Sequence, residues 1–151
     1  MPSLLQPADI VIRMLLSVLL AAPVGWERES LDKPAGLRTH LLVGLGSACF
    51  TLAGLLLYQD LGGGDSRLDP TRIVQGVAGG IGFLGAGTIL KAGQDPKGLT
   101  TAAGVWTVGA VGVACGLGYF LVAGLAALAA LLVLLAGRLS ALHGASGGDN
   151  R

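Results

Sequence analysis

Charged residues are scarce in this chain of 151 residues, since Asp, Glu, Lys and Arg together make up 13% of it. A soluble domain carries about a quarter of such residues. The net charge is +1, and there is no block of basic residues that would attract a nucleic-acid backbone. With 2 cysteines, the chain also lacks a disulfide framework. These shortages exclude a nucleic-acid-binding protein, a disordered chain and an ordinary soluble enzyme.

Apolar residues are abundant instead, at 52% of the chain. Five stretches are long enough to cross a bilayer, which takes about 20 residues in a helix. The predicted spans are about 10–26, 41–58, 71–90, 100–116 and 119–136. We therefore predict an all-α membrane bundle over residues 1–140, with a short flexible tail at 141–151. No Lys or Arg precedes the first span, so it lacks the basic region of a cleaved signal peptide and is expected to be retained.

The basic residues between the spans predict the orientation of the bundle. Basic residues concentrate on the cytoplasmic side of membrane proteins. One face collects Arg28, Lys33, Arg38, Lys91, Lys97, Arg138 and Arg151, and the other only Arg67 and Arg72. The sequence therefore predicts an outside N-terminus and a cytoplasmic C-terminus.

Glycine is frequent inside the spans, and it lets helix backbones approach closely. The packing candidates are Gly76, Gly80, Gly82 and Gly85 in the third span and Gly112 and Gly116 in the fourth. We expect the third span to form the centre of the bundle and the fifth to face lipid. The run from Gly80 to Gly85 matches G-x-G-x-x-G, but it lies inside a hydrophobic span with no acidic residue at the expected distance. We therefore interpret it as packing rather than as a dinucleotide site.

One group of polar residues is predicted at the outer face. Arg13 lies inside the first span, where an ionised side chain is costly, and Asp9 is four residues earlier on the same helical face. Arg13 either pairs with Asp9 or extends its charge to the surface. Asp69 precedes Pro70, a typical helix start. Asp69 can also join an outer polar cluster with Asp9, Arg13, Arg72 and Gln75.

A second group is predicted at the inner face. Glu27, Arg28 and Glu29 end the first span, either as a solvated helix terminus or as a cluster with Arg38, Thr39 and His40 of the second. Thr100 and Thr101 begin the fourth helix, where capping is expected. His40 has no partner at metal-ligand spacing. No catalytic set is recognisable, so we expect no enzyme, and no charged residue lies in the middle of a span, as ion-coupled transporters often require.

Several sequence blocks resemble those of the MgtC/SapB family, in the family's order. They are GWERE at 25–29, AGLRTH at 35–40, GGIGFLGAG at 79–87, GLTTAA at 98–103 with Trp106 following, and ACGLGY at 114–119. The resemblance implies a bacterial inner-membrane protein with five hydrophobic helices. It also implies a link to growth at low magnesium and survival in macrophages, and a partner such as the F-type ATP synthase or a P-type magnesium transporter. Longer members carry a soluble domain after the fifth span, which is not expected here.

Two functions of different kinds follow. The first is a regulatory membrane protein that acts through a membrane partner and supports adaptation to low magnesium. The second is a magnesium-binding channel or transporter that acts as a homo-oligomer, with a homodimer as the simplest form. Glu27 and Glu29 inside, or Asp69 outside, are the candidate ligands for Mg²⁺, which is usually held by one or two carboxylates. No other cofactor is expected, and no nucleic acid.

Overall fold

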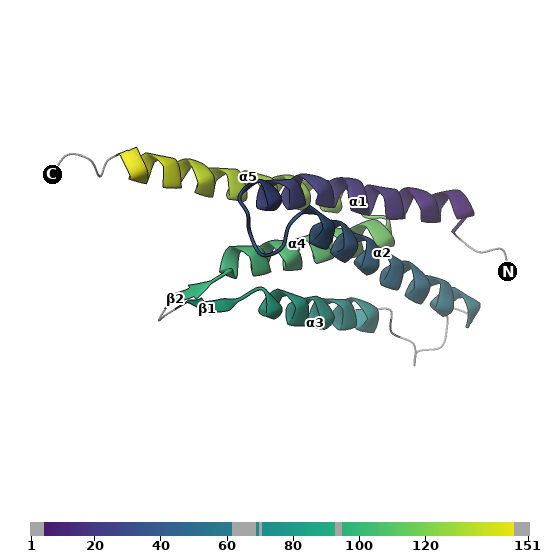
Figure 1. Cartoon of the computed structure of the whole chain (residues 1–151). Coiled ribbons are helices and arrows are strands. Elements are labelled where there is room, and N and C mark those ends of the chain that lie inside the picture. The colour runs from purple at the N-terminus through teal and green to yellow at the C-terminus, as the bar shows by residue number, and fades with distance from the viewer. Residues whose placement is uncertain (1–4, 62–68, 70, 93–94, 147–151) are drawn as a thin grey trace.

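A computed structural model describes residues 5–61, 69, 71–92 and 95–146, with side chains over 5–61, 69, 71–89 and 97–138. In this part of the chain, the elements are α1 (Pro7–Ser30), α2 (Leu37–Asp60), α3 (Thr71–Gly87), β1 (Leu90–Ala92), β2 (Asp95–Lys97), α4 (Leu99–Leu117) and α5 (Phe120–Ser146) (Figure 1). Successive helices run in opposite directions. We call the end with the α1–α2 turn and the β1–β2 hairpin the hairpin end, and the other the α4–α5 end.

The predicted all-α membrane bundle is confirmed. Helices α1, α2, α4 and α5 are long and apolar enough to cross a membrane. The only strands among the described residues are the three-residue β1 and β2, which pair antiparallel between α3 and α4. Helix α3 has 17 residues, which corresponds to about 25 Å at about 1.5 Å per residue. It is the shortest helix of the five described.

Helix α3 ends at Gly87, before the predicted end of the third span at residue 90. The backbone N–H groups of Thr88 and Ile89 donate to the carbonyls of Gly85 and Ala86, which tightens the last turn. The Thr88 hydroxyl also donates to the Gly85 carbonyl, at 2.7 Å. Helix α5 instead continues past the predicted end at 136 to Ser146, so part of the predicted tail is helical. Residues 147–151 lie outside the described residues.

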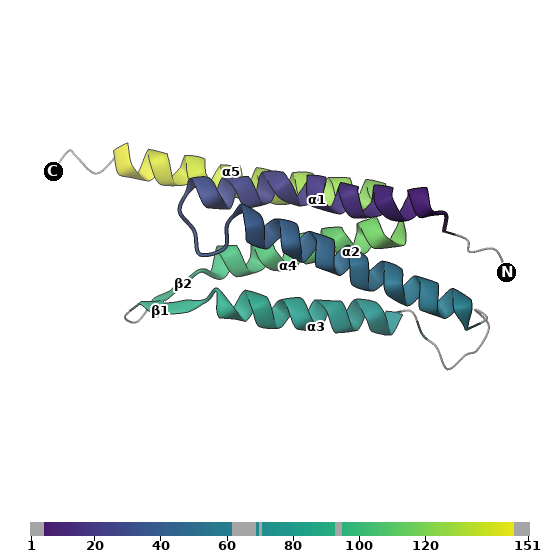
Figure 2. The same cartoon turned by 45° about the vertical axis from the view of Figure 1, so that its right-hand side comes forward.

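The centre of the bundle is α4, and the expectation that the third span occupies it is wrong. Helix α4 contacts α1, α2, α3 and α5, whereas α3 packs mainly on α4 and touches α2 more sparsely. Figure 2 shows α3 at the edge, with α4 lying between it and α5. Val105, Val108 and Val111 of α4 are fully buried. On α5, Ala123 and Ala127 are buried and most leucines are exposed, which agrees with a lipid-facing helix.

Glycines of α4 allow neighbouring helices to pack closely around it, which accounts for its central position. A Cβ atom at Gly112 would collide with the Gly44 carbonyl of α2, and one at Gly116 would lie 2.7 Å from the Cβ of Thr51. A Cβ atom at Gly109, on another face, would collide with Ile81 of α3. The backbones therefore approach closely along α4, as the four-residue spacing of Gly112 and Gly116 predicts.

The glycines of α3 behave differently. Gly85 alone among the four candidates packs within the chain, because a Cβ there would lie 3.3 Å from the Ala102 carbonyl oxygen. At Gly76, Gly80 and Gly82, no described atom beyond the helix's own backbone lies within 4 Å of that position. These three glycines do not mediate packing within the described chain.

Candidate functional site

Arg13 caps the C-terminal end of α4 rather than pairing with Asp9. Helix α4 ends at Gly118, whose φ of +84° suits glycine, and Tyr119 N–H and Gly118 N–H donate to the carbonyls of Ala114 and Cys115. The next free carbonyl, that of Gly116, accepts from Arg13 Nη1 at 2.7 Å. A cation at this position also complements the negative end of the helix dipole.

Asp9 caps the start of α1, the helix to which it belongs, and Asp69 caps the start of α3, which follows it. Gln6 N–H donates to Asp9 Oδ2 at 3.0 Å, in a capping box that starts α1. Thr71 N–H donates to Asp69 Oδ1 at 2.8 Å at the start of α3. Hydrogen bonds from the Thr71 side chain and backbone hold the pKa of the Asp69 carboxyl below its usual value.

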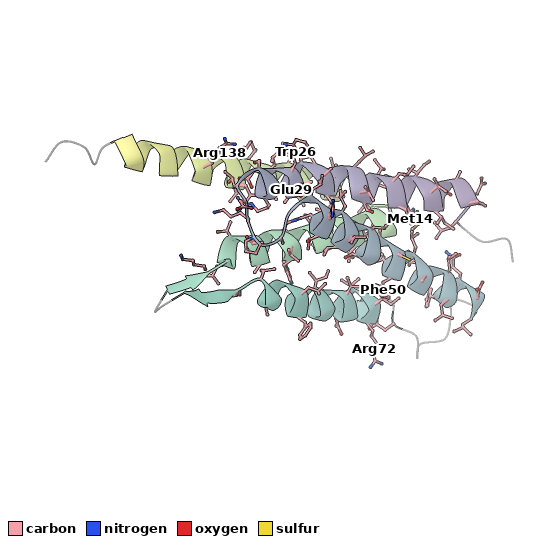
Figure 3. All side chains as sticks on the ribbon, viewed as in Figure 1. Met14, Trp26, Glu29, Phe50, Arg72 and Arg138 are labelled. Carbon is pink, nitrogen blue, oxygen red and sulfur yellow. The ribbon has the colours of Figure 1, made fainter. Side chains whose placement is uncertain are left out.

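The predicted outer cluster is not assembled among the described residues. No hydrogen bond or ion pair joins Asp69 to Asp9 or Arg13 in this part of the chain. Arg72 and Gln75 are exposed, and Figure 3 shows Arg72 pointing away from the bundle. This end of the molecule therefore holds separate helix caps.

The hairpin end holds a buried ionic group. Glu27 and Arg28 are only 4% and 5% exposed, and Arg28 Nε donates to Glu27 Oε2 at 2.5 Å. Burying two charges is expensive unless the remaining polar atoms are also satisfied. Glu27 Oε1 is buried and has no hydrogen-bond partner among the described residues.

His40 is the third polar residue of this buried group, at 0% exposure. Its Nδ1 lies 2.8 Å from the Gly36 carbonyl oxygen, which can only accept, so Nδ1 carries a proton. The ring fits between α1 and α4 because Gly25 and Gly104 lack side chains; a Cβ at Gly104 would lie 3.4 Å from His40 Nε2. Nε2 is buried and, like Glu27 Oε1, has no hydrogen-bond partner in the part of the chain that the structure describes.

Of the other candidates at the inner face, Glu29 bonds the N-terminus of α2, and Arg38 and Thr39 border a groove. Glu29 is exposed beside the α1–α2 turn (Figure 3), and its Oε2 accepts from Leu37 N–H at 2.7 Å, at the N-terminus of α2. Arg38 and Thr39 are exposed and border a groove described below. The inner cluster thus consists of Glu27, Arg28 and His40, and the three other candidates lie outside it.

The capping expected of Thr100 and Thr101 is wrong. The N-cap of α4 is Gly98, at a φ of +94°, and no side chain caps this helix end. A Cβ at Gly98 would collide with the Thr88 carbonyl, so glycine is required by both conformation and space. Thr101 is buried in the first turn of α4, and Thr100 is exposed there.

The three candidate ligands for Mg²⁺, Glu27, Glu29 and Asp69, differ in how far their carboxylate oxygens are already hydrogen-bonded. Glu29 and Asp69 are already engaged by backbone N–H groups, whereas Glu27 keeps one unpartnered oxygen. No group of three or more His, Cys, Asp or Glu side chains that could hold a metal ion is found among the described residues. Mg²⁺ keeps several waters and is often bound by one or two carboxylates. Glu27 has a carboxylate oxygen without a hydrogen bond from the described residues, but its burial and its ion pair with Arg28 leave little room for a hydrated ion.

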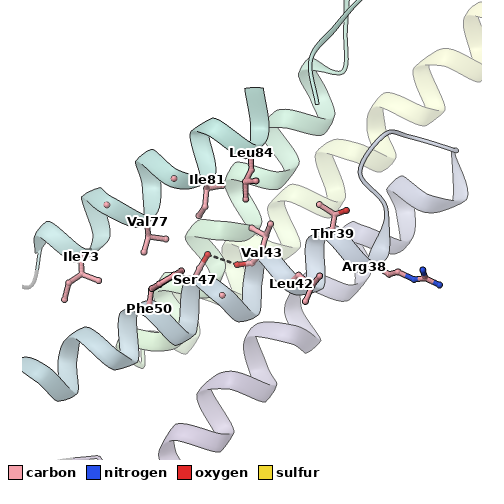
Figure 4. Close-up of a pocket in the computed structure, with 13 residues that line it drawn as sticks. Arg38, Thr39, Leu42, Val43, Ser47, Phe50, Ile73, Val77, Ile81 and Leu84 are labelled. Atoms are coloured by element: carbon pink, nitrogen blue, oxygen red, sulfur yellow. Dashed lines mark hydrogen bonds between the residues drawn. The ribbon is translucent and has the colours of Figure 1, made fainter. Parts of the chain in front are cut away.

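A groove of about 880 Å³ lies between α2 and α3, which the sequence did not predict. It extends from Arg38 to Phe50 on α2 and from Ile73 to Leu84 on α3, and its walls are mainly apolar. Figure 4 shows Phe50 and Ile73 toward one end and Thr39 toward the other. The sequence signal for this groove is an apolar spacing that puts four residues on one face of α3, namely Ile73, Val77, Ile81 and Leu84.

The comparison with known families agrees with the blocks recognised in the sequence. The model of the MgtC family matches residues 14–141. The chain belongs to the MgtC family. With four apolar spanning helices, it is a bacterial multi-pass membrane protein in contact with the lipid bilayer.

Three relatives illustrate the similarity. "Putative magnesium transporter YhiD" of Escherichia coli (strain K12) is 42% identical over 114 residues, which are 75% of this chain and 53% of the relative. Protein MgtC of Salmonella typhimurium (strain LT2) is 40% identical over 125 residues, 83% of this chain and 49% of that protein. An uncharacterized protein of Synechocystis is 39% identical over 128 residues, 85% and 50% of the two chains. The chain thus spans about half the length of these relatives, and no solved structure matches it.

Proposed function

We propose that this MgtC-family protein is a regulatory protein of the inner membrane that supports adaptation to low magnesium by binding a helix of a membrane partner. The observation that carries the proposal is the outward face of α3. Gln75, Gly79, Gly82 and Ala86 are all exposed and recur at three- and four-residue intervals, so they lie along one side of the helix.

This face is suited to close approach by another helix. Apart from the helix's own backbone, no atom of the described residues lies within 4 Å of the Cβ position at Gly79 or Gly82. Each glycine weakens a helix by about 1 kcal/mol relative to alanine, and packing against a neighbour can offset that loss. Small residues at such spacing are typical of helix interfaces in membranes. The family resemblance suggests the F-type ATP synthase or a P-type magnesium transporter as the partner.

The proposal is tested by purification from native membranes in a mild detergent. We expect a specific partner to be retained by the wild type and lost in Gly82→Leu. Gly124→Leu on α5 is the matched control, because no atom lies within 4 Å of its Cβ position either. Gly112→Leu is unsuitable, since Gly112 packs against α2 inside the chain. Recovery of only a homo-oligomer from native membranes would reject the proposal.

The second candidate function is a magnesium channel or transporter acting as a homo-oligomer. It is favoured by the unpartnered Glu27 Oε1 and by the printed name of the E. coli relative. The test is magnesium influx into proteoliposomes, with empty liposomes as the control. A channel requires flux in the wild type that is lost in Glu27→Gln and kept in Asp32→Asn, which changes an exposed carboxylate at the same end. Folded wild-type protein that passes no magnesium would exclude this function.

A further inference from the structure

The groove between α2 and α3 is closed at one end and open at the other. A Cβ atom at Gly54 of α2 would collide with the side chain of Ile73 of α3, so the two helices touch there. From this contact they diverge toward the hairpin end, as Figures 1 and 2 both show. Between them, no described atom other than those of each helix's own backbone lies within 4 Å of the Cβ positions at Gly46, Gly76 and Gly80.

The length of the groove matches one leaflet of a bilayer rather than the whole membrane. From Arg38 to Phe50 the α2 wall rises by about 18 Å, at about 1.5 Å per residue. Half of a hydrocarbon core of about 30 Å is about 15 Å. A helix that crosses the membrane needs the full thickness, and the Gly54–Ile73 contact interrupts the groove before that. An acyl chain of a single leaflet has the appropriate length.

The open end of the groove is polar and cationic. Arg38 and Thr39 border it, and both side chains are exposed. The one ion pair among the described residues joins Glu27 and Arg28, so Arg38 is not ion-paired within that part of the chain. The remaining walls, which include Leu42, Val77 and Leu84, are mainly apolar, and the hydroxyl of Ser47 donates to the Val43 carbonyl. A cation above an apolar channel complements an anionic headgroup above an acyl chain, and basic pockets between membrane helices bind such lipids.

We propose that this groove is a binding site for one anionic phospholipid of the leaflet at the hairpin end. The Arg38 guanidinium and the Thr39 hydroxyl donate to the phosphate group, and an acyl chain occupies the channel past Gly46, Gly76 and Gly80. The site is independent of the proposed partner surface, which uses the opposite, outward face of α3.

The test is native mass spectrometry of delipidated protein in detergent, to which phosphatidylglycerol or phosphatidylcholine with the same acyl chains is added. We expect one tightly retained phosphatidylglycerol and weaker retention of phosphatidylcholine. Arg38→Gln should weaken phosphatidylglycerol binding about tenfold, the effect of losing a hydrogen bond to a charged group. Lys33→Gln is the matched control, because Lys33 is an exposed cation at the same end that does not line the groove.

A second pair of variants tests the apolar part of the site. Gly80→Leu places a side chain in the open channel and should abolish retention of the lipid, whereas Gly124→Leu on α5 should not. Equal retention of both lipids, or equal weakening by Arg38→Gln and Lys33→Gln, would overturn the proposal. So would a dimer that Gly80→Leu dissociates while phosphatidylglycerol binding is unchanged, because the groove would then hold a second copy of the chain.

Discussion

Replacing Arg13 with Met removes the guanidinium that donates to the Gly116 carbonyl and keeps an apolar side chain of similar length. A hydrogen bond from a charged group contributes about 1.5–3 kcal/mol, and a cation at a helix C-terminus about 0.3–1 kcal/mol. Because Arg13 is only half-buried, the lower part of this range applies. We expect the free energy of unfolding to fall by about 2 kcal/mol.

The assay is thermal unfolding of the purified protein in detergent, followed by circular dichroism. For a chain of this size, 1 kcal/mol corresponds to about 2–4 °C, so Arg13→Met should lower the Tm by about 4–8 °C. Arg72→Met, which removes an exposed cation at the same end, should change the Tm little.

A double-mutant cycle with Asp9→Asn separates the two interpretations of Arg13. If Arg13 caps α4 and Asp9 caps α1, the two effects on the free energy of unfolding should add. A coupling energy above about 0.5 kcal/mol would indicate a direct ion pair between the two side chains. That result, or an Arg13→Met variant as stable as Arg72→Met, would refute the reasoning.

Two further predictions concern helix packing and capping. Gly112→Ala should destabilise the fold by about 1–3 kcal/mol, because the new methyl group overlaps the Gly44 carbonyl. At Gly46 the new methyl group meets open space, so Gly46→Ala should be neutral or stabilising in the same thermal assay. The pKa of the Asp69 carboxyl is lowered in the folded state. The Asp69 cap therefore stabilises the fold at pH values above the unfolded-state pKa of about 3.9. This contribution to stability is lost as the pH falls through the folded-state pKa. The Tm difference between wild type and Asp69→Ala should therefore be present at about pH 6 and shrink at about pH 3, and a difference that does not change with pH would contradict this assignment.

Much of the helical framework could be predicted from hydrophobic length alone. The five helices, four of which are long and apolar enough to cross a membrane, and the short α4–α5 connection follow from apolar runs and the residues that interrupt them. The central position of α4 could not be predicted, because a glycine-rich face is the same in sequence whether its neighbour is in the chain or outside it. Gly112 packs against α2, whereas Gly80, with similar neighbours in sequence, packs against no other element of the described chain.

The polar residues show a similar limit. Asp9 was the natural partner for Arg13 because it lies one turn away, but the actual acceptor is 103 residues distant in sequence. The burial of His40 depends on Gly25 and Gly104, which come from two other helices. Local spacing identifies the polar residues at each end of the bundle, but only the tertiary arrangement determines which of them are buried together. The orientation in the membrane stays a prediction from the basic residues.

The short helix α3 has a consequence for the membrane around the protein. Its length of about 25 Å falls about 5 Å below a typical hydrocarbon thickness, while the helices on the other sides of the bundle are longer. Where a helix of this length crosses a bilayer, the lipids beside it would have to compress to cover it, at a cost of fractions of a kcal/mol per Å of mismatch. Such one-sided thinning would favour neighbours whose own helices are short, and we therefore expect association to occur at the α3 edge.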